Sequence, residues 1–174
     1  MEFIKKFSIL MFLVLGCGSN LNPRIAPENN VIGLQVSEAL VSDINDNTFI
    51  IPAILTKPRI FIFATELCST CQSEHRALRD IMAAHAGALP SNVDIYTIMV
   101  DAVDSADATG FKLATGIQWN PYYQTGDALK KSLCGEMAVY PCVVIELPIR
   151  GIVLQKIGEV SATELQSQTG AWLW

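Results

Sequence analysis

Two largely apolar runs mark the centre of the chain. Residues 59–64 read RIFIFA and residues 93–100 read VDIYTIMV. Such runs of β-branched and aromatic residues are typical of central strands that are covered on both faces. Between them, over residues 68–86, the pattern changes to a helical period that includes Leu78, Ile81, Met82 and His85. The sequence therefore predicts two buried strands joined by an amphipathic helix.

The other segments predict shorter elements around this unit. Strands at 40–41 and 48–51 flank the turn-rich residues 42–47, which indicates a small hairpin. After the second buried strand we expect a helix at 105–114, a loop at 116–126, a short helix at 127–133, strands at 142–147 and 152–157, and a last helix that starts at a capping box at 161–164. This order predicts an α/β fold: a central mixed β-sheet flanked by helices on both faces, with an N-terminal β-hairpin extension.

The first residues have the pattern of an export signal. Lys5 and Lys6 precede an apolar run at 7–15, which is too short for a stable membrane span but has the length of a signal-peptide core. The run leads into Gly16 and Cys17, which resemble the lipobox of bacterial lipoproteins, where the cysteine is diacylated and becomes the new N-terminus. We therefore expect a lipoprotein signal peptide at 1–16, lipidation of Cys17, a flexible tether at 17–32 and one folded domain at 33–174. The alternative is an ordinary signal peptide, which leaves Cys17 as a plain thiol or removes it.

Composition and charge narrow the classes of function. Hydrophobic residues make up 51% of the 174 and charged residues 17%, which excludes intrinsic disorder of the whole chain. The formal charge of −5, without a long run of Lys or Arg, argues against binding to nucleic acid. Five cysteines against two histidines favour redox chemistry over a histidine-built metal site. With Cys17 lipidated, four cysteines remain, and an even number suits disulfide chemistry outside the cytoplasm.

The motif Cys68-Ser69-Thr70-Cys71 follows a predicted buried strand and opens a predicted helix. Cysteines at this spacing in a first helical turn can close a small disulfide ring, and the positive end of the helix stabilises a thiolate on the first of them. Cys68 is then the exposed nucleophile, while Cys71 lies inward and resolves the mixed disulfide. Zinc sites and structural bridges use the same spacing, so the strand-to-helix context in an exported chain is what favours the redox interpretation.

From residue 33 to residue 168 the chain resembles the thioredoxin superfamily, most closely its TlpA/ResA-like membrane-tethered thiol–disulfide oxidoreductases. Residues 63–68 (FATELC) are similar to the strand end that leads into C-x-x-C in that family, and residues 116–123 are similar to the stretch before its penultimate helix. Residues 139–141 (VYP) resemble its cis-proline loop, and a strand, a turn, a strand and a last helix follow. The resemblance implies a thioredoxin-like fold and thiol–disulfide exchange with protein substrates.

For residues that match functional positions of the family, the resemblance implies the same roles. Cys68 matches the attacking cysteine and Cys71 the resolving one. Tyr140 and Pro141 match the cis-proline loop that faces the disulfide and lines the groove for the substrate chain. Glu74 matches a glutamate that handles protons near the thiols, and its alternative is a solvated carboxylate on the helix surface.

The chain departs from the family at several positions. Ile62 stands where thioredoxins proper hold a buried Asp, which makes Glu74 the better candidate for an acid or base. Leu67 replaces the Trp that usually precedes the first cysteine, and Ser69-Thr70 is neither Gly-Pro nor Pro-His. These changes leave the redox potential and the direction of electron flow undefined by analogy.

Other interpretations remain open at this point. Cys134 and Cys142 are candidates for a second disulfide, or are two small buried thiols. A four-cysteine zinc site, and metal binding through His75 and His85, fit the spacings less well. A peroxiredoxin-like thiol peroxidase is the enzymatic alternative, because Thr65 precedes Cys68 at the spacing of its motif, although that motif's proline is Phe61 here. The remaining alternative is a non-catalytic binding lipoprotein on the same fold.

We therefore expect a thiol–disulfide oxidoreductase that needs no metal or other cofactor. Its expected partners are protein thiols or disulfides and a membrane electron donor or acceptor. Its expected location is the periplasmic side of the cell envelope, where the lipid on Cys17 holds it to a membrane.

Overall fold

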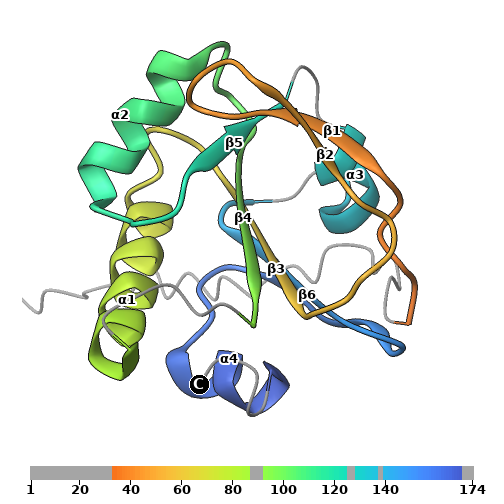
Figure 1. Ribbon diagram of the computed structural model, residues 1–174. Helices are drawn as coiled ribbons and strands as arrows, with labels where there is room; N and C mark the ends of the chain where they lie inside the picture. The colour runs from red at the N-terminus through yellow and green to blue at the C-terminus, as the bar shows by residue number, and fades with distance from the viewer. Residues whose placement is uncertain (1–32, 87–91, 125–127, 137–138, 170–174) are drawn as a thin grey trace, which may run out of the picture.

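A computed structural model describes residues 33–86, 92–124, 128–136 and 139–169 (Figure 1). Its strands are β1 (Ala39–Ser42), β2 (Thr48–Ile51), β3 (Arg59–Ala64), β4 (Asp94–Met99), β5 (Pro121–Tyr123), β6 (Cys142–Leu147) and β7 (Gly151–Ile157). Its helices are α1 (Ser69–Ala86), α2 (Ser105–Thr115), α3 (Ala128–Cys134) and α4 (Ala162–Thr169). The predicted signal peptide, Cys17 and the predicted tether lie outside the described residues.

The strands form one mixed sheet in the order β2-β1-β5-β4-β3-β6-β7. β3, β4 and β5 run parallel, whereas β6 is antiparallel to β3, β7 to β6, and β1 to both β2 and β5. The first two strands are the hairpin that the sequence indicates. The predicted α/β architecture, with a mixed sheet and an N-terminal hairpin, is therefore confirmed.

The central strand β3 is buried along its whole length, and its side chains alternate between two apolar layers. Phe61 and Phe63 pack in one layer with Leu129 of α3 and with the hairpin. Ile60 and Ile62 pack in the other, with residues of α1 and α4. Because both faces are covered, the strand is a continuous apolar run rather than an alternating one.

The helices cover the two faces unequally. Figure 1 shows α1 and α2 on one side of the sheet and α3 on the other. Leu165 places α4 in the same layer as Leu78 of α1. Helices therefore flank both faces, as the element order predicts.

The predicted loop at 116–126 was wrong in part, because it contains β5. Pro121–Tyr123 pairs with residues 97–99 of β4, and Tyr123 pairs with Ser42 of β1. Proline at the first position of a strand removes one donor without breaking the ladder further along. This short strand joins the N-terminal hairpin to the central sheet.

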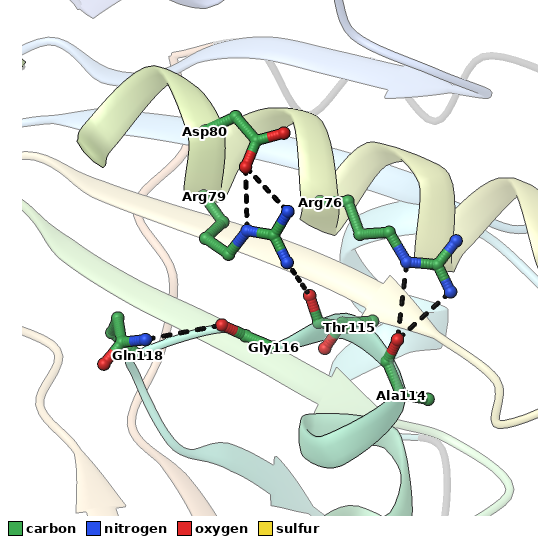
Figure 2. A network of polar contacts seen from close by, with 7 residues as sticks. All are labelled: Arg76, Arg79, Asp80, Ala114, Thr115, Gly116 and Gln118. Atoms are coloured by element: carbon green, nitrogen blue, oxygen red, sulfur yellow. Dashed lines mark hydrogen bonds and ion pairs between the residues drawn. The ribbon is translucent and has the colours of Figure 1, made fainter. Parts of the chain in front are cut away.

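α1 holds the C-terminal end of α2 in place (Figure 2). Arg76 donates to the carbonyl oxygen of Ala114 at 3.1 Å, and Arg79 donates to that of Thr115 at 2.7 Å. Gly116 follows with a positive φ of 68°, which glycine adopts without steric cost and which ends the helix. The two arginines satisfy carbonyl groups that the helix itself leaves without a partner.

An ion pair is buried at the start of β3. Arg59 Nε donates to Glu146 Oε2 of β6 at 2.6 Å, and both side chains are almost fully buried. The same two side chains bind the backbone of the segment around the hairpin, through Pro52 O, Val36 O and Val36 N. Satisfying these extra groups is what makes a buried ion pair tolerable.

The first described residues, Gly33 and Leu34, lie beside the turn between β6 and β7. Gly33 N–H donates to Ile152 O, and Ile152 N–H donates to Leu34 O, both at 2.8 Å. Gly151 has a φ of 67°, and a Cβ there would lie 2.5 Å from Leu34 O, so this approach requires glycine.

Candidate active site

Two loops meet at one edge of the sheet. β3 ends at Ala64 and leads through residues 65–68 into α1, while β6 begins at Cys142, directly opposite Phe63 of β3. Because the two strands are antiparallel, the end of β3 and the start of β6 lie at the same edge. The C-x-x-C motif and the Tyr140-Pro141 pair are therefore brought together. Cys68 and Tyr140 both pack against the apolar cluster that contains Cys71.

Cys68 is the residue directly before α1. It has the position of an N-cap, since the backbone N–H of Cys71 donates to Cys68 Sγ at 3.1 Å. A sulfur at this place receives an N–H donor that the helix leaves free and feels the positive end of the helix dipole. Both effects favour a thiolate on Cys68 over a thiol.

Cys68 and Cys71 form a disulfide with their Cα atoms 5.2 Å apart. Cys68 is partly exposed, whereas Cys71 is fully buried. A partner can therefore reach the first sulfur but not the second. This asymmetry matches the division of work that the sequence predicts.

The peptide bond between Tyr140 and Pro141 is cis, as the resemblance implies. The Pro141 carbonyl oxygen accepts the N–H of Gly158 at 2.7 Å, which ties this loop to the segment after β7. Lys130 Nζ of α3 lies 6.0 Å from the centre of the Tyr140 ring. The loop is thus held from two sides.

Two strongly exposed apolar side chains flank this centre. Leu67 precedes Cys68 and is 90% exposed, and Val139 precedes Tyr140 and is 68% exposed. Beside them, Asp101 accepts the Glu66 N–H with both carboxylate oxygens, at 3.1 and 3.2 Å. Each of the two loops beside the disulfide therefore exposes an apolar side chain, with carboxylates next to them.

Glu74 is buried one turn beyond Cys71, with 6% of its surface exposed. Its Oε1 accepts the Val160 N–H at 3.1 Å, and its Oε2 has no hydrogen-bond partner among the described residues. Burial raises the pKa of Glu74 to about 7, because removal from water disfavours the charged form, and Glu159 adds to this effect. The interpretation as a solvated carboxylate was wrong, while its role toward the thiols stays a prediction.

The Glu74 carboxyl lines a cleft of about 470 Å³ between α1 and the start of α4. Ala77 and Leu78 form part of its apolar wall, and an ion pair between Lys156 and Glu164 lies at its rim. The hydrogen bond from Val160 joins this cleft to residue 158, and so to Pro141. Glu74 is therefore connected, through residues 158–160, to the segment that supports the cis-proline loop, which the sequence does not indicate.

Cys134 and Cys142 form a second disulfide, with their Cα atoms 6.3 Å apart. Both cysteines are buried. The bond links the end of α3 to the residue that follows Pro141. With both disulfides formed, as in this structure, the four sulfurs are unavailable for the four-cysteine zinc site that the sequence leaves open as an alternative.

From the sequence, His75 is a candidate for metal binding only. Its Nδ1 lies 2.7 Å from Cys71 O and its Nε2 lies 2.9 Å from Thr97 Oγ1, so both ring nitrogens are occupied by protein groups. Its position four residues after Cys71 is the only sequence feature that could have indicated contact with the motif. The side chain of His85 lies outside the described part of the structure.

No family model and no curated protein matches the sequence. Solved structures do match the fold. The thioredoxin domain of a thiol-disulfide oxidoreductase from Bacteroides vulgatus is 17% identical with a TM-score of 0.62, and the match covers 82% of this chain and 98% of that one. A secreted disulfide oxidoreductase of Mycobacterium tuberculosis is 18% identical with a TM-score of 0.58, over 76% and 95% of the two chains.

A peroxiredoxin-like protein from Aquifex aeolicus is also similar, with 17% identity, a TM-score of 0.64 and coverage of 81% and 86% of the two chains. At these identities the likeness establishes the fold and leaves the activity to the residues of the site. The chain has a thioredoxin-like fold, as the resemblance in the sequence implies.

In the part of the chain that the structure describes, no helix has the length and apolar character needed to cross a membrane.

Proposed function

We propose that this protein is an extracytoplasmic thiol–disulfide oxidoreductase, anchored to a membrane by lipid on Cys17, that reduces disulfides in protein substrates. The observation that carries the proposal is the cysteine pair at the start of α1. Cys68 is partly exposed and receives the N–H of Cys71, while Cys71 is buried beside it. The similar structures described as thiol–disulfide oxidoreductases support it, and those described as secreted support the location.

The reaction begins with the reduced pair. The Cys68 thiolate attacks one sulfur of a substrate disulfide, a mixed disulfide forms, and the other substrate sulfur leaves as a thiolate. Cys71, after losing its proton, attacks Cys68 Sγ and releases the second substrate sulfur. Two electrons pass to the substrate, and Cys68 and Cys71 end as the disulfide seen here. A membrane electron donor returns the pair to the dithiol.

Leu67 and Val139 suit this substrate. Their exposed side chains can cover apolar residues next to a substrate cysteine, and Tyr140 and Pro141 line the approach from the other loop. Glu74 is the candidate to exchange a proton during the reaction, since its pKa of about 7 allows both states near neutral pH.

Reduction of insulin by dithiothreitol tests the proposal. The wild-type protein should accelerate the reaction, and Cys68→Ser should not. Turnover of hydrogen peroxide is the parallel assay, because it is what the thiol-peroxidase alternative requires. If the protein neither reduces insulin nor oxidises a test dithiol, the proposal is wrong. In that case peroxide turnover identifies a peroxidase, and its absence leaves a binding lipoprotein.

A further inference from the structure

A buried hydrogen-bond chain lies directly beneath the cysteine pair. It joins His75 of α1, Thr97 of β4 and Trp119, which precedes β5. His75 Nδ1 lies 2.7 Å from Cys71 O, His75 Nε2 lies 2.9 Å from Thr97 Oγ1, and Trp119 Nε1 lies 2.9 Å from the same hydroxyl. His75 and Thr97 are fully buried. None of these residues takes part in the proposed exchange of electrons.

The two ends of the chain fix the direction of every bond in it. The indole N–H of Trp119 can only donate, so Thr97 Oγ1 accepts from it. The Cys71 carbonyl oxygen can only accept, so the hydrogen of a neutral His75 ring is on Nδ1. Nε2 is then an acceptor and takes the Thr97 hydroxyl hydrogen. Every polar atom of the three side chains is satisfied in one arrangement.

The surroundings keep the His75 ring neutral. Burial lowers its pKa to about 4, against a smaller opposing effect of the Cys71 carbonyl. Phe111 of α2 contacts the ring edge-on, with centroids 4.9 Å apart, and Trp119 stacks at 6.2 Å. A ring enclosed in this way is unsuited to move protons, but it can hold a backbone in place.

Trp119, the third residue of the hydrogen-bond chain, is positioned by α1 itself. The hydrogen bonds from Arg76 and Arg79 to the end of α2, drawn in Figure 2, fix the point where the chain turns at Gly116. Trp119 follows three residues later and reaches back toward α1. The helix that carries the cysteines is thus attached to β4 and to the segment before β5.

We infer that His75 is a positioning residue for the redox pair: its ring, held by Thr97 and Trp119, fixes the backbone of Cys71 so that the Cys71 N–H stays directed at Cys68 Sγ. The inference rests on the proposed function in one respect, namely that Cys68 is the nucleophile. A hydrogen bond to a thiolate favours the charged form, so a less firmly held Cys71 raises the pKa of Cys68.

The first test is independent of any activity. Nitrogen NMR of the ring of His75, assigned by its absence in His75→Phe, should show a neutral imidazole with hydrogen on Nδ1 across pH 5–8. A ring that protonates in this range, or that carries its hydrogen on Nε2, overturns the inference.

The second test measures the pKa of Cys68 from the rate of alkylation of the reduced protein against pH. Thr97→Val has nearly the same shape and lacks the hydroxyl, and Trp119→Phe removes the indole donor together with part of the ring that stacks on His75. We expect each to raise the pKa of Cys68 by roughly half a unit, which slows alkylation about threefold below that pKa. Thr97→Ser keeps the hydroxyl and should keep the wild-type value.

A matched control is Thr169→Val, which removes another buried hydroxyl, one that donates to Leu165 O within α4. The pKa of Cys68 should not change in this variant. Glu66 and Asp101 beside the pair are the same in every variant, so their charges cannot cause a difference. If Thr97→Val does not fold, Trp119→Phe carries the test.

The outcomes separate the two proposals. An unchanged pKa of Cys68 in folded Thr97→Val or Trp119→Phe overturns the positioning role, even if insulin is reduced normally. An inactive wild-type protein with the predicted ring tautomer overturns the proposed function and leaves the hydrogen-bond chain standing.

Discussion

Glu74 and Val160 are joined by a hydrogen bond of 3.1 Å that leaves one oxygen of a buried carboxyl without a partner in the described residues. Such a group is more stable with a proton than without one. The folded protein therefore holds a proton on Glu74 at a pH where the unfolded chain has already released it.

The first prediction concerns stability against pH. Glu74 has a pKa of about 7 in the folded state against 4.5 ordinarily, so its contribution is fully present below pH 4.5 and is lost as pH rises through 7. We expect the free energy of unfolding to fall by on the order of 2–3 kcal/mol over this range, relative to Glu74→Gln. Urea titrations of both proteins at several pH values measure the difference.

Glu38→Gln is the control, because Glu38 is an exposed carboxylate outside the cleft that contains Glu74. It should keep the wild-type slope. Parallel curves for wild type and Glu74→Gln would show that the pKa of Glu74 is the same in the folded and unfolded states. The same variant tests its role toward the thiols: if Glu74 exchanges a proton with Cys71, the pH profile of thiol reactivity shifts while the fold stays intact.

The second prediction concerns covalent intermediates. Without Cys71 the mixed disulfide on Cys68 cannot be resolved, so Cys71→Ser should accumulate covalent complexes with its natural partners. Mass spectrometry of complexes purified under non-reducing conditions identifies them. Cys68→Ser is the matched control and should accumulate none. Equal amounts of complex in both variants would contradict the assignment of Cys68 as the attacking cysteine and Cys71 as the resolving one.

The third prediction concerns the apolar side chains beside the disulfide. Leu67→Ser and Val139→Ser should each lower kcat/KM for a protein disulfide by about fivefold, since roughly 1 kcal/mol of apolar contact is lost. Ile149→Ser is the control, because Ile149 is 99% exposed in the turn between β6 and β7, at the opposite edge of the sheet. A small disulfide such as oxidised glutathione should be reduced equally by all four proteins. Equal loss in the control would mean that the effect is not local.

The fourth prediction concerns the buried disulfide. Replacing both Cys134 and Cys142 with Ala should lower the free energy of unfolding by about 2–3 kcal/mol, from the short loop that the bond closes. Thermal and urea unfolding measure this. Cys68→Ala with Cys71→Ala is the comparison pair, and it should cost less, because that bond spans a sequence separation of 3 rather than 8. If the reduction of insulin falls as well, the bond also supports the cis-proline loop, since Cys142 follows Pro141 directly.

Long apolar runs made most of the fold predictable. The run at 59–64 is typical of a strand covered on both faces, and the change to a helical period at Cys68 marks the start of α1. β5 was not predictable, because it has three residues, starts with Pro121 and becomes a strand only through its neighbours β4 and β1.

Some residues of the candidate site could likewise be predicted from the sequence, and others could not. Cys68, Cys71 and Pro141 are recognisable because their chemistry depends on spacing along the chain. The roles of Thr97 and Trp119 depend instead on how β4 and the segment before β5 pack against α1. Thr97 follows His75 by 22 residues, and Trp119 follows Thr97 by another 22. Nothing in their local sequence marks either residue as a partner of the motif.

The position of Gly33, the first described residue, bears on how far the disulfide lies from an N-terminal membrane anchor. Gly33 and Leu34 lie beside Ile152, at the edge of the sheet where β3 begins and β6 ends, whereas Cys68 lies at the edge where β3 ends. A six-residue strand separates the two edges by about 20 Å. If Cys17 is the anchor, the disulfide faces away from the bilayer when the domain stands upright on its tether. An electron donor embedded in that membrane must then extend an aqueous portion of its own across this height, or meet the domain lying on its side.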